Sequence, residues 1–150
     1  MMARSGGQLT CRRSKGFIPF AEIGLRQMAR QKLQTMTVEQ LVALFESIGV
    51  DQDRAELEGD TRRYNSLFDR MKEVVEELRS RPGDERRALI PLLAHKNTQV
   101  KLKAAIATLA IVPEEARRTL EIVEQSAIYP QAANAGFMLS GLKDGSYIPS

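Results

Sequence analysis

The chain has 150 residues, of which 43% are hydrophobic and 27% are charged, a composition typical of a single globular domain. The sequence contains no apolar run of about 18 residues, so no membrane-spanning helix is expected. Cys11 is the only cysteine, which excludes an intrachain disulfide and is consistent with a reducing compartment. We therefore expect a cytoplasmic protein.

Positive charge is concentrated near the N-terminus. Residues 1–35 contain seven basic residues and one acid, a balance of +6, whereas residues 36–150 contain 15 basic and 18 acidic residues, a balance of −3. A folded domain that binds nucleic acid needs a basic face. We therefore do not expect residues 36–150 to bind nucleic acid.

Residues 1–35 are expected to form a disordered basic leader, because they are rich in basic residues and glycine and have no helix cap. Three interpretations are open: a transit peptide, a basic arm for nucleic acid or an anionic membrane, and a start codon assigned too early. The sequence around Met36 resembles a natural beginning. Thr37 can cap a helix, and Gln40 stands where a capping box requires it.

The first two helices after Met36 are expected on either side of Gly49. Apolar residues at helical spacing lead up to Gly49, which suits the left-handed position after a helix end. The second helix is the longest, with an apolar stripe from Leu57 to Leu78, and Gly59 and Asp60 mark a break near its beginning. The sequence Arg81-Pro82-Gly83-Asp84 ends this helix, and Asp84 can cap the next.

The C-terminal half predicts four shorter helices. The third contains Pro91, which should weaken or kink its middle, and the fourth runs from about Thr98 to Ala110 after a turn at residues 95–97. Pro113 suits the first position of a fifth helix that begins with two acids. The sixth helix opens at Tyr129-Pro130 and ends near Gly141, before a turn at Asp144-Gly145.

A weak internal repeat relates the third and fourth helices to the fifth and sixth. An offset of 31 residues pairs Leu89 with Leu120, Leu92 with Val123, Ala104 with Ala135, Ala105 with Gly136, and Ile106 with Phe137. The pattern predicts an all-α fold of about six helices, arranged as stacked antiparallel hairpins of the ARM/HEAT type. We expect Gly136 to face another helix at short range.

No recognisable catalytic motif is present. The sequence lacks a phosphate loop, a dinucleotide fingerprint and a nucleophile elbow. Glu73, Glu76 and Glu77 share a helix surface, but no Glu-x-x-His motif accompanies them. We therefore expect no enzyme activity, no catalytic residue, no cofactor and no metal.

The candidate partner-contact residues are polar side chains at turns and helix beginnings, together with one asparagine inside the long helix. Each also has an ordinary structural interpretation, such as a surface turn for His95, core packing for Tyr129 or a bond between helices for Asn65. Lys101 and Lys103 are interpreted as part of a mixed charged surface. The candidates are Asn65, His95, Asn97, Gln99, Tyr129, Gln131 and Asn134.

Several segments carry a resemblance to a known family. The region from Met36 to the C-terminus resembles the bacterial family catalogued as domain of unknown function 2019. The resemblance implies a helical fold similar to ARM/HEAT stacks and implies no activity. Asn134 replaces an acidic residue frequent in the family, which puts a polar role of that position in doubt. The matching segments are residues 36–41, 64–69, 81–89, 99–105, 129–132 and 135–136.

These observations favour a non-enzymatic protein-binding module, such as an adaptor or an immunity-type protein that neutralises a toxin. The alternative is a nucleic-acid-binding HEAT-like protein that uses the basic leader as its contact arm. A third interpretation is an enzyme, with a small-molecule pocket formed by Tyr64, Asn65, Tyr129 and Gln131.

Overall fold

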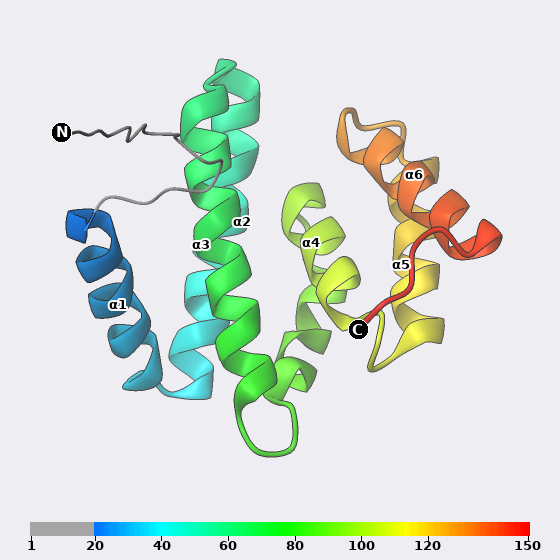
Figure 1. Ribbon diagram of the computed structural model, residues 1–150. Helices are drawn as coiled ribbons and strands as arrows, with labels where there is room; N and C mark the ends of the chain where they lie inside the picture. The colour runs from blue at the N-terminus through cyan, green and yellow to red at the C-terminus, as the bar shows by residue number, and fades with distance from the viewer. Residues whose placement is uncertain (1–19) are drawn as a thin grey trace, which may run out of the picture. The chain divides into compact units, whose positions relative to one another are not determined.

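The computed structural model describes residues 20–150, and every regular element among them is a helix (Figure 1). These elements are six α-helices and one 3₁₀ helix, which confirms the expected all-α fold of about six helices. The chain divides into two units, residues 1–32 and residues 33–150. The larger unit contains the core and the candidate site.

Helix α1 (Phe20–Gln34) corrects the expectation of disorder for this part of the leader. Its last ten residues are leucine, arginine, glutamine, methionine, alanine and lysine, all of which favour helix. The basic residues of this segment are therefore compatible with a helix. Residues 1–19 lie outside the described residues, and there the leader remains a prediction.

Helix α2 (Val38–Glu58) begins at the predicted capping box. The Thr37 hydroxyl accepts a hydrogen bond from the Gln40 backbone N–H at 3.1 Å, and Gln40 Oε1 accepts one from the Thr37 N–H at 2.9 Å. The predicted helix end at Gly49 is wrong, because α2 continues to Glu58. It ends instead at Gly59, whose φ of 70° provides the left-handed cap.

Helix α3 (Thr61–Ser80) is the predicted long amphipathic helix, although it begins later than expected. Asp60 caps it by accepting a hydrogen bond from the Arg63 N–H at 3.0 Å. Leu57 is 82% exposed at the end of α2 and does not belong to the buried stripe. That stripe consists of Leu67, Met71, Val74 and Leu78.

The next two helices form a tight pair. Helix η1 (Glu85–Ala94) is a 3₁₀ helix with Pro91 inside it, in keeping with the expected weakening by proline. Helix α4 (Thr98–Thr108) follows, with Asn97 as its cap. The Asn97 Oδ1 accepts hydrogen bonds from the N–H groups of Gln99 and Val100 at 3.0 and 3.1 Å.

Helices α5 (Pro113–Gln125) and α6 (Gln131–Asp144) form the last pair. Pro113 occupies the beginning of α5 and two acids follow it, as predicted. The predicted end of α6 at Gly141 is wrong, because α6 continues to the left-handed cap at Gly145, where φ is 79°. Gly141 is buried inside the helix, and a Cβ there would lie 3.1 Å from Tyr147 Cβ.

Within residues 33–150 the helices pack as three antiparallel pairs, α2 with α3, η1 with α4, and α5 with α6, and α4 lies between the outer pairs (Figure 1). Two hydrophobic clusters fill the spaces between them, one built mainly by α2, α3 and η1 and one built mainly by α5 and α6. Helix α4 contributes to both clusters, through Val100 and Ala104 on one side and Leu102 and Ala105 on the other. It therefore joins the two halves of the core.

Helices α2 and α4 approach each other closely at Gly49. A Cβ atom at Gly49 would lie 2.8 Å from Val100 Cγ2 and 3.3 Å from Val100 Cα, so α2 and α4 could not pack as they do around a larger residue. At Gly136 a Cβ would meet only the flexible side chain of Glu124, with Oε1 at 3.0 Å. Gly136 therefore faces α5 at short range, as expected, but the neighbouring group is the end of a movable side chain and does not exclude a larger residue.

No helix within residues 20–150 combines the length and the apolar character that crossing a membrane requires.

Candidate functional site

Three glutamines from three helices form a buried amide cluster, which we define as Gln52, Gln99 and Gln131. Gln131 Nε2 donates to Gln99 Oε1 at 3.0 Å, and Gln99 Nε2 donates to Gln52 Oε1 at 2.9 Å. All three side chains are at most 2% exposed. The cluster therefore connects α6 to α4 and α4 to α2 through the core.

Polar neighbours satisfy most of the amide cluster. Gln99 Nε2 also reaches the Tyr64 hydroxyl at 3.3 Å, and Gln131 Nε2 reaches Asp53 Oδ1 at 3.5 Å. The Gln52 Nε2 group has no hydrogen-bond partner among the described residues. An unpaired buried amide costs free energy, so the cluster fixes the positions of the helices at some expense of stability.

His95 and Asn97 hold the turn before α4 against α2. The Asn97 N–H donates to His95 Nδ1 at 2.9 Å, which leaves the ring proton on Nε2, where Glu46 Oε1 accepts it at 2.8 Å. Asn97 Nδ2 also donates to Asp53 Oδ2 at 3.3 Å. His95 therefore lies in a turn, as expected, but it is a half-buried residue bonded to α2 rather than a simple surface residue.

The other candidate residues do not join this network. Asn65 is exposed, and no hydrogen bond of its side chain is found among the described residues, so the expected bond to another helix is absent there. Tyr129 is 70% exposed, which corrects its expected core packing and separates it from the buried Gln131. The pocket expected from Tyr64, Asn65, Tyr129 and Gln131 is therefore not assembled. Asn134 is half-buried and lines a groove described next.

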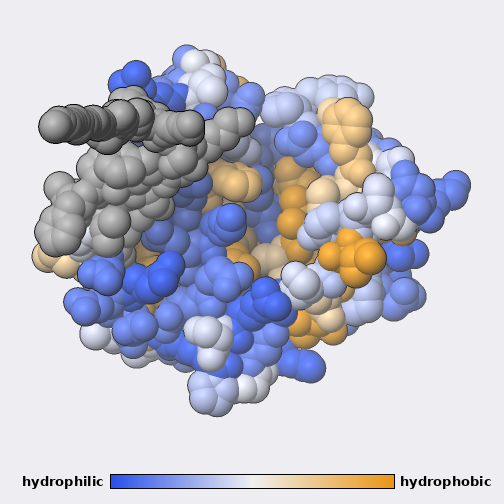
Figure 2. Space-filling model, viewed as in Figure 1, coloured by the Kyte–Doolittle hydropathy of each residue, from blue (hydrophilic) through white to orange (hydrophobic). Residues whose placement is uncertain are grey.

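A large groove lies over α4, between α3 and α6, with a volume of about 560 Å³. Figure 2 shows apolar surface on both walls of this hollow. Phe68 on one wall is 46% exposed, and Phe137 on the other is 76% exposed. We call this surface the α3–α6 groove. Its other apolar lining side chains include Met71, Val75, Ile106 and Met138.

Lys103 extends from α4 into the α3–α6 groove. Its Nζ lies 4.9 Å from the centre of the Phe68 ring and 5.9 Å from that of Tyr64, within the range of cation–π attraction. Burial lowers the pKa of Lys103 below its ordinary value of 10.5. The interpretation of Lys103 as part of a mixed charged surface is therefore wrong, because apolar and aromatic groups surround it.

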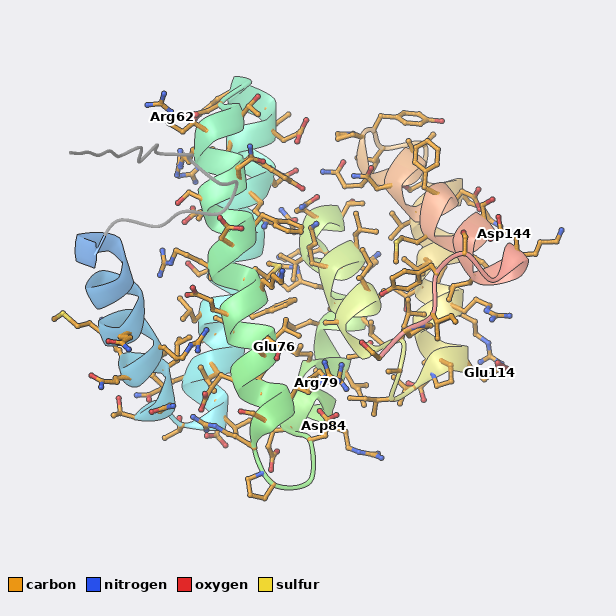
Figure 3. The ribbon with its side chains drawn as sticks, viewed as in Figure 1. Arg62, Glu76, Arg79, Asp84, Glu114 and Asp144 are labelled. Atoms are coloured by element: carbon orange, nitrogen blue, oxygen red, sulfur yellow. The ribbon has the colours of Figure 1, made fainter. Side chains whose placement is uncertain are left out.

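The charged residues of the groove are mainly basic. Lys72, Arg79, Arg86 and Lys103 line it together with one acid, Glu76. Glu76 and Arg79 lie on the side of α3 that faces η1 (Figure 3), and they pair with each other at 3.5 Å. The groove therefore has an excess of positive charge, although residues 36–150 as a whole are slightly acidic.

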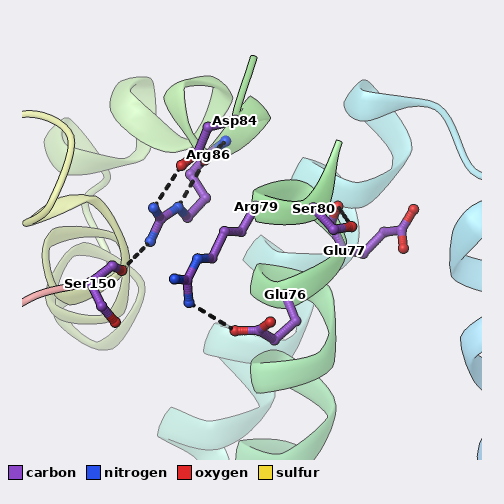
Figure 4. Close-up of polar contacts among 7 residues, drawn as sticks. All are labelled: Glu76, Glu77, Arg79, Ser80, Asp84, Arg86 and Ser150. Atoms are coloured by element: carbon purple, nitrogen blue, oxygen red, sulfur yellow. Dashed lines mark hydrogen bonds and ion pairs between the residues drawn. The ribbon is translucent and has the colours of Figure 1, made fainter. Parts of the chain in front are cut away.

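The chain's final segment borders the groove at its η1 end. Arg86 Nη1 donates to the Ser150 backbone oxygen at 2.9 Å, while its Nε and Nη2 bind the Asp84 carboxylate at 2.9 and 2.7 Å (Figure 4). Hydrogen bonds from Arg86 lower the pKa of Asp84 below its ordinary 3.8. The guanidinium group of Arg86 thus holds Ser150 against the groove wall.

The sequence offered weak signals for this groove. Phe137 stands opposite Ile106 in the internal repeat, yet the repeat does not reveal that one is exposed and the other half-buried. Lys103 is flanked by apolar and small residues, which is unusual for a solvated lysine. Within residues 20–150, no group of three or more histidine, cysteine, aspartate or glutamate side chains is placed to hold a metal ion.

Comparison with known proteins identifies a structural relative and a family. No curated protein matches the chain. The crystal structure of the protein RPA1889 from Rhodopseudomonas palustris CGA009 is similar to this chain, with 45% sequence identity and a TM-score of 0.77. The match covers 79% of this chain and 98% of that one. The model of the family described as Domain of unknown function (DUF2019) matches residues 39–143, so the chain belongs to this family.

Proposed function

We propose that the chain is a non-enzymatic protein-binding module of the bacterial cytoplasm, an adaptor or an immunity-type protein, and that the α3–α6 groove is its binding surface. The observation that carries the proposal is the groove itself, which has about 560 Å³ of open volume and aromatic side chains exposed on both walls. Exposed apolar surface with a polar rim is typical of interaction sites.

The arrangement of the helices supports a binding role in a HEAT-like stack. The three packed pairs provide a rigid frame in which α3 and α6 hold Phe68 and Phe137 on opposite walls. Aromatic side chains held this way lose little entropy when a partner binds, and such residues dominate the binding energy of protein interfaces.

The proposal is tested by affinity capture with the purified full chain in extract of the native host, at physiological salt. Phe137→Ser removes an exposed aromatic ring from one wall of the groove. Ile122→Ser is the control, because Ile122 is 57% exposed on α5 and does not line the groove. We expect a protein that wild type and Ile122→Ser retain and that Phe137→Ser loses. Equal retention by all three, or no retained protein, would count against the proposal.

The rival proposal is nucleic-acid binding with the basic leader as contact arm. The four basic residues of the groove, together with its exposed aromatic rings, favour it, since single strands bind to such combinations. Titration of a labelled single-stranded oligonucleotide and its duplex decides the matter. Binding that weakens in Phe137→Ser and also weakens steeply with salt would favour the rival, and no binding would remove it.

A further inference from the structure

Lys103 is a positive charge in the floor of a largely apolar groove. No ion pair of Lys103 is found among residues 20–150, and its contacts there are the rings of Phe68 and Tyr64. Keeping an ammonium group in such surroundings costs free energy, as the lowered pKa indicates. A partner that supplies a carboxylate would compensate this charge.

The other charged side chains that line the groove also leave positive charge without an acidic partner. Arg79 is paired with Glu76 at 3.5 Å, and Arg86 is paired with Asp84 at 2.7 Å. Lys72 and Lys103 have no such acidic partner among the described residues. The charge that remains to be complemented is therefore positive, and it lies beside the apolar wall that Phe68 and Met71 form.

The groove already holds polypeptide at one end. Tyr147, Pro149 and Ser150 line it, the chain there has no regular secondary structure, and Arg86 donates to a backbone carbonyl of this segment. Tyr147 also packs against the buried cluster of α5 and α6. The wall therefore accepts irregular chain through a hydrogen bond to a backbone oxygen and through a ring, contacts that a peptide ligand would use.

We propose that the α3–α6 groove binds an extended segment of a partner protein in which an acidic residue stands beside a large apolar one. The carboxylate binds Lys103 Nζ, and the apolar side chain packs between Phe68 and Phe137. This inference rests on the proposed protein-binding function and deepens it by stating the chemistry of the partner. Lys103 is the specificity-determining residue, because a neutral segment would leave its charge uncompensated.

The test begins with selection from a displayed library of random peptides against the immobilised full chain. We expect the selected peptides to share an aspartate or glutamate adjacent to an aromatic or large aliphatic residue. One selected peptide is then synthesised in two forms. One form keeps the glutamate or aspartate, and the other carries glutamine or asparagine in its place. The affinity of both forms is measured for wild type, Lys103→Met and Lys101→Met.

Lys101 is the matched control, because it lies on the same helix and does not line the groove. We expect a loss of affinity of about tenfold or more for Lys103→Met and for the amide peptide, and no change for Lys101→Met. The two losses should not add when combined, since each removes the same ion pair. Because the amide peptide tests wild-type protein, a folding defect of Lys103→Met cannot hide the result.

The outcomes separate this inference from the proposed function. Peptides that depend on Phe137 but carry no acid, or that bind Lys103→Met as well as wild type, would overturn the inference and leave the proposed function standing. Absence of any selected peptide, together with binding of dodecanoate by wild type, would replace the polypeptide with a small amphiphilic carboxylate. Absence of any selected peptide without dodecanoate binding would overturn the inference. If affinity capture also retained no partner, both proposals would fall.

Discussion

Lys103 should contribute measurably to the pH dependence of the free energy of unfolding. Burial lowers its pKa below 10.5, so the folded chain binds this proton more weakly than the unfolded chain does. The free energy of unfolding should therefore rise as the pH rises from the lowered pKa towards 10.5, and the full penalty should remain at lower pH.

We expect this contribution to appear as a difference between wild type and Lys103→Met in urea unfolding at about pH 7 and about pH 10. The difference should shift in favour of wild type at the higher pH, because methionine has no proton to lose. A difference that stays constant with pH would show that Lys103 titrates normally, and the argument from its burial would then fail.

The two contrasting glycines make a second prediction at the level of single residues. Gly49→Ala should lower the free energy of unfolding by about 1–3 kcal/mol, because the new methyl group overlaps Val100, a stiff side chain next to backbone. The gain in helix propensity of up to about 1 kcal/mol does not offset this overlap.

Gly136→Ala is the matched control, because it has the same propensity gain and meets only the movable Glu124 side chain. We expect it to leave the melting temperature unchanged or to raise it. If Gly136→Ala were the more damaging substitution, the α2–α4 contact would not be the tighter one.

At the scale of helices, the amide cluster predicts unequal effects for two glutamines. Gln99→Met removes the hydrogen bonds to both Gln52 and Gln131 and should destabilise the fold by about 1–3 kcal/mol. Gln52→Met removes one accepted bond and also the unpaired Nε2 group, so its cost should be smaller. Chemical denaturation of the two variants measures both effects, and equal costs would contradict the bonding order described here.

Several helix beginnings were predictable from sequence because caps are local, although that of α3 was not. Thr37 with Gln40, and Pro113 with its two acids, act within a few residues and form as expected. The ends predicted at Gly49 and Gly141 failed because each glycine serves a contact with a residue elsewhere in the chain, Val100 or Tyr147. The sequence alone does not distinguish a glycine that caps a helix from a glycine that permits a close contact inside one.

The candidate site shows the same division between local and distant causes. Gln99 and Gln131 were noticed because they stand at helix beginnings, a local signal, yet their burial depends on partners 47 and 32 residues away. The α3–α6 groove was missed because its walls, Phe68 and Phe137, come from helices far apart in the sequence. The candidate residues predicted from the sequence are polar, whereas the groove is built largely from apolar residues.

At the scale of the whole larger unit, the two hydrophobic clusters predict uneven local stability. Leu120 is fully buried in the cluster of α5 and α6, and Leu120→Ala should cost about 2–5 kcal/mol. Because that cluster meets the other one mainly at α4, amide protection should fall most in residues 113–144 and least in residues 38–80. Hydrogen exchange followed by mass spectrometry measures this, and a uniform loss would indicate a single cooperative core.

The hydrogen bond between Arg86 and the Ser150 backbone oxygen has a practical consequence for work with this protein. An affinity tag or fluorescent label attached after Ser150 would begin at the rim of the α3–α6 groove, where it could compete with a binding partner. Surface immobilisation through that end would present the groove towards the support. A label at Leu57, which is exposed on α2 and does not line the groove, keeps the groove accessible in the experiments described above.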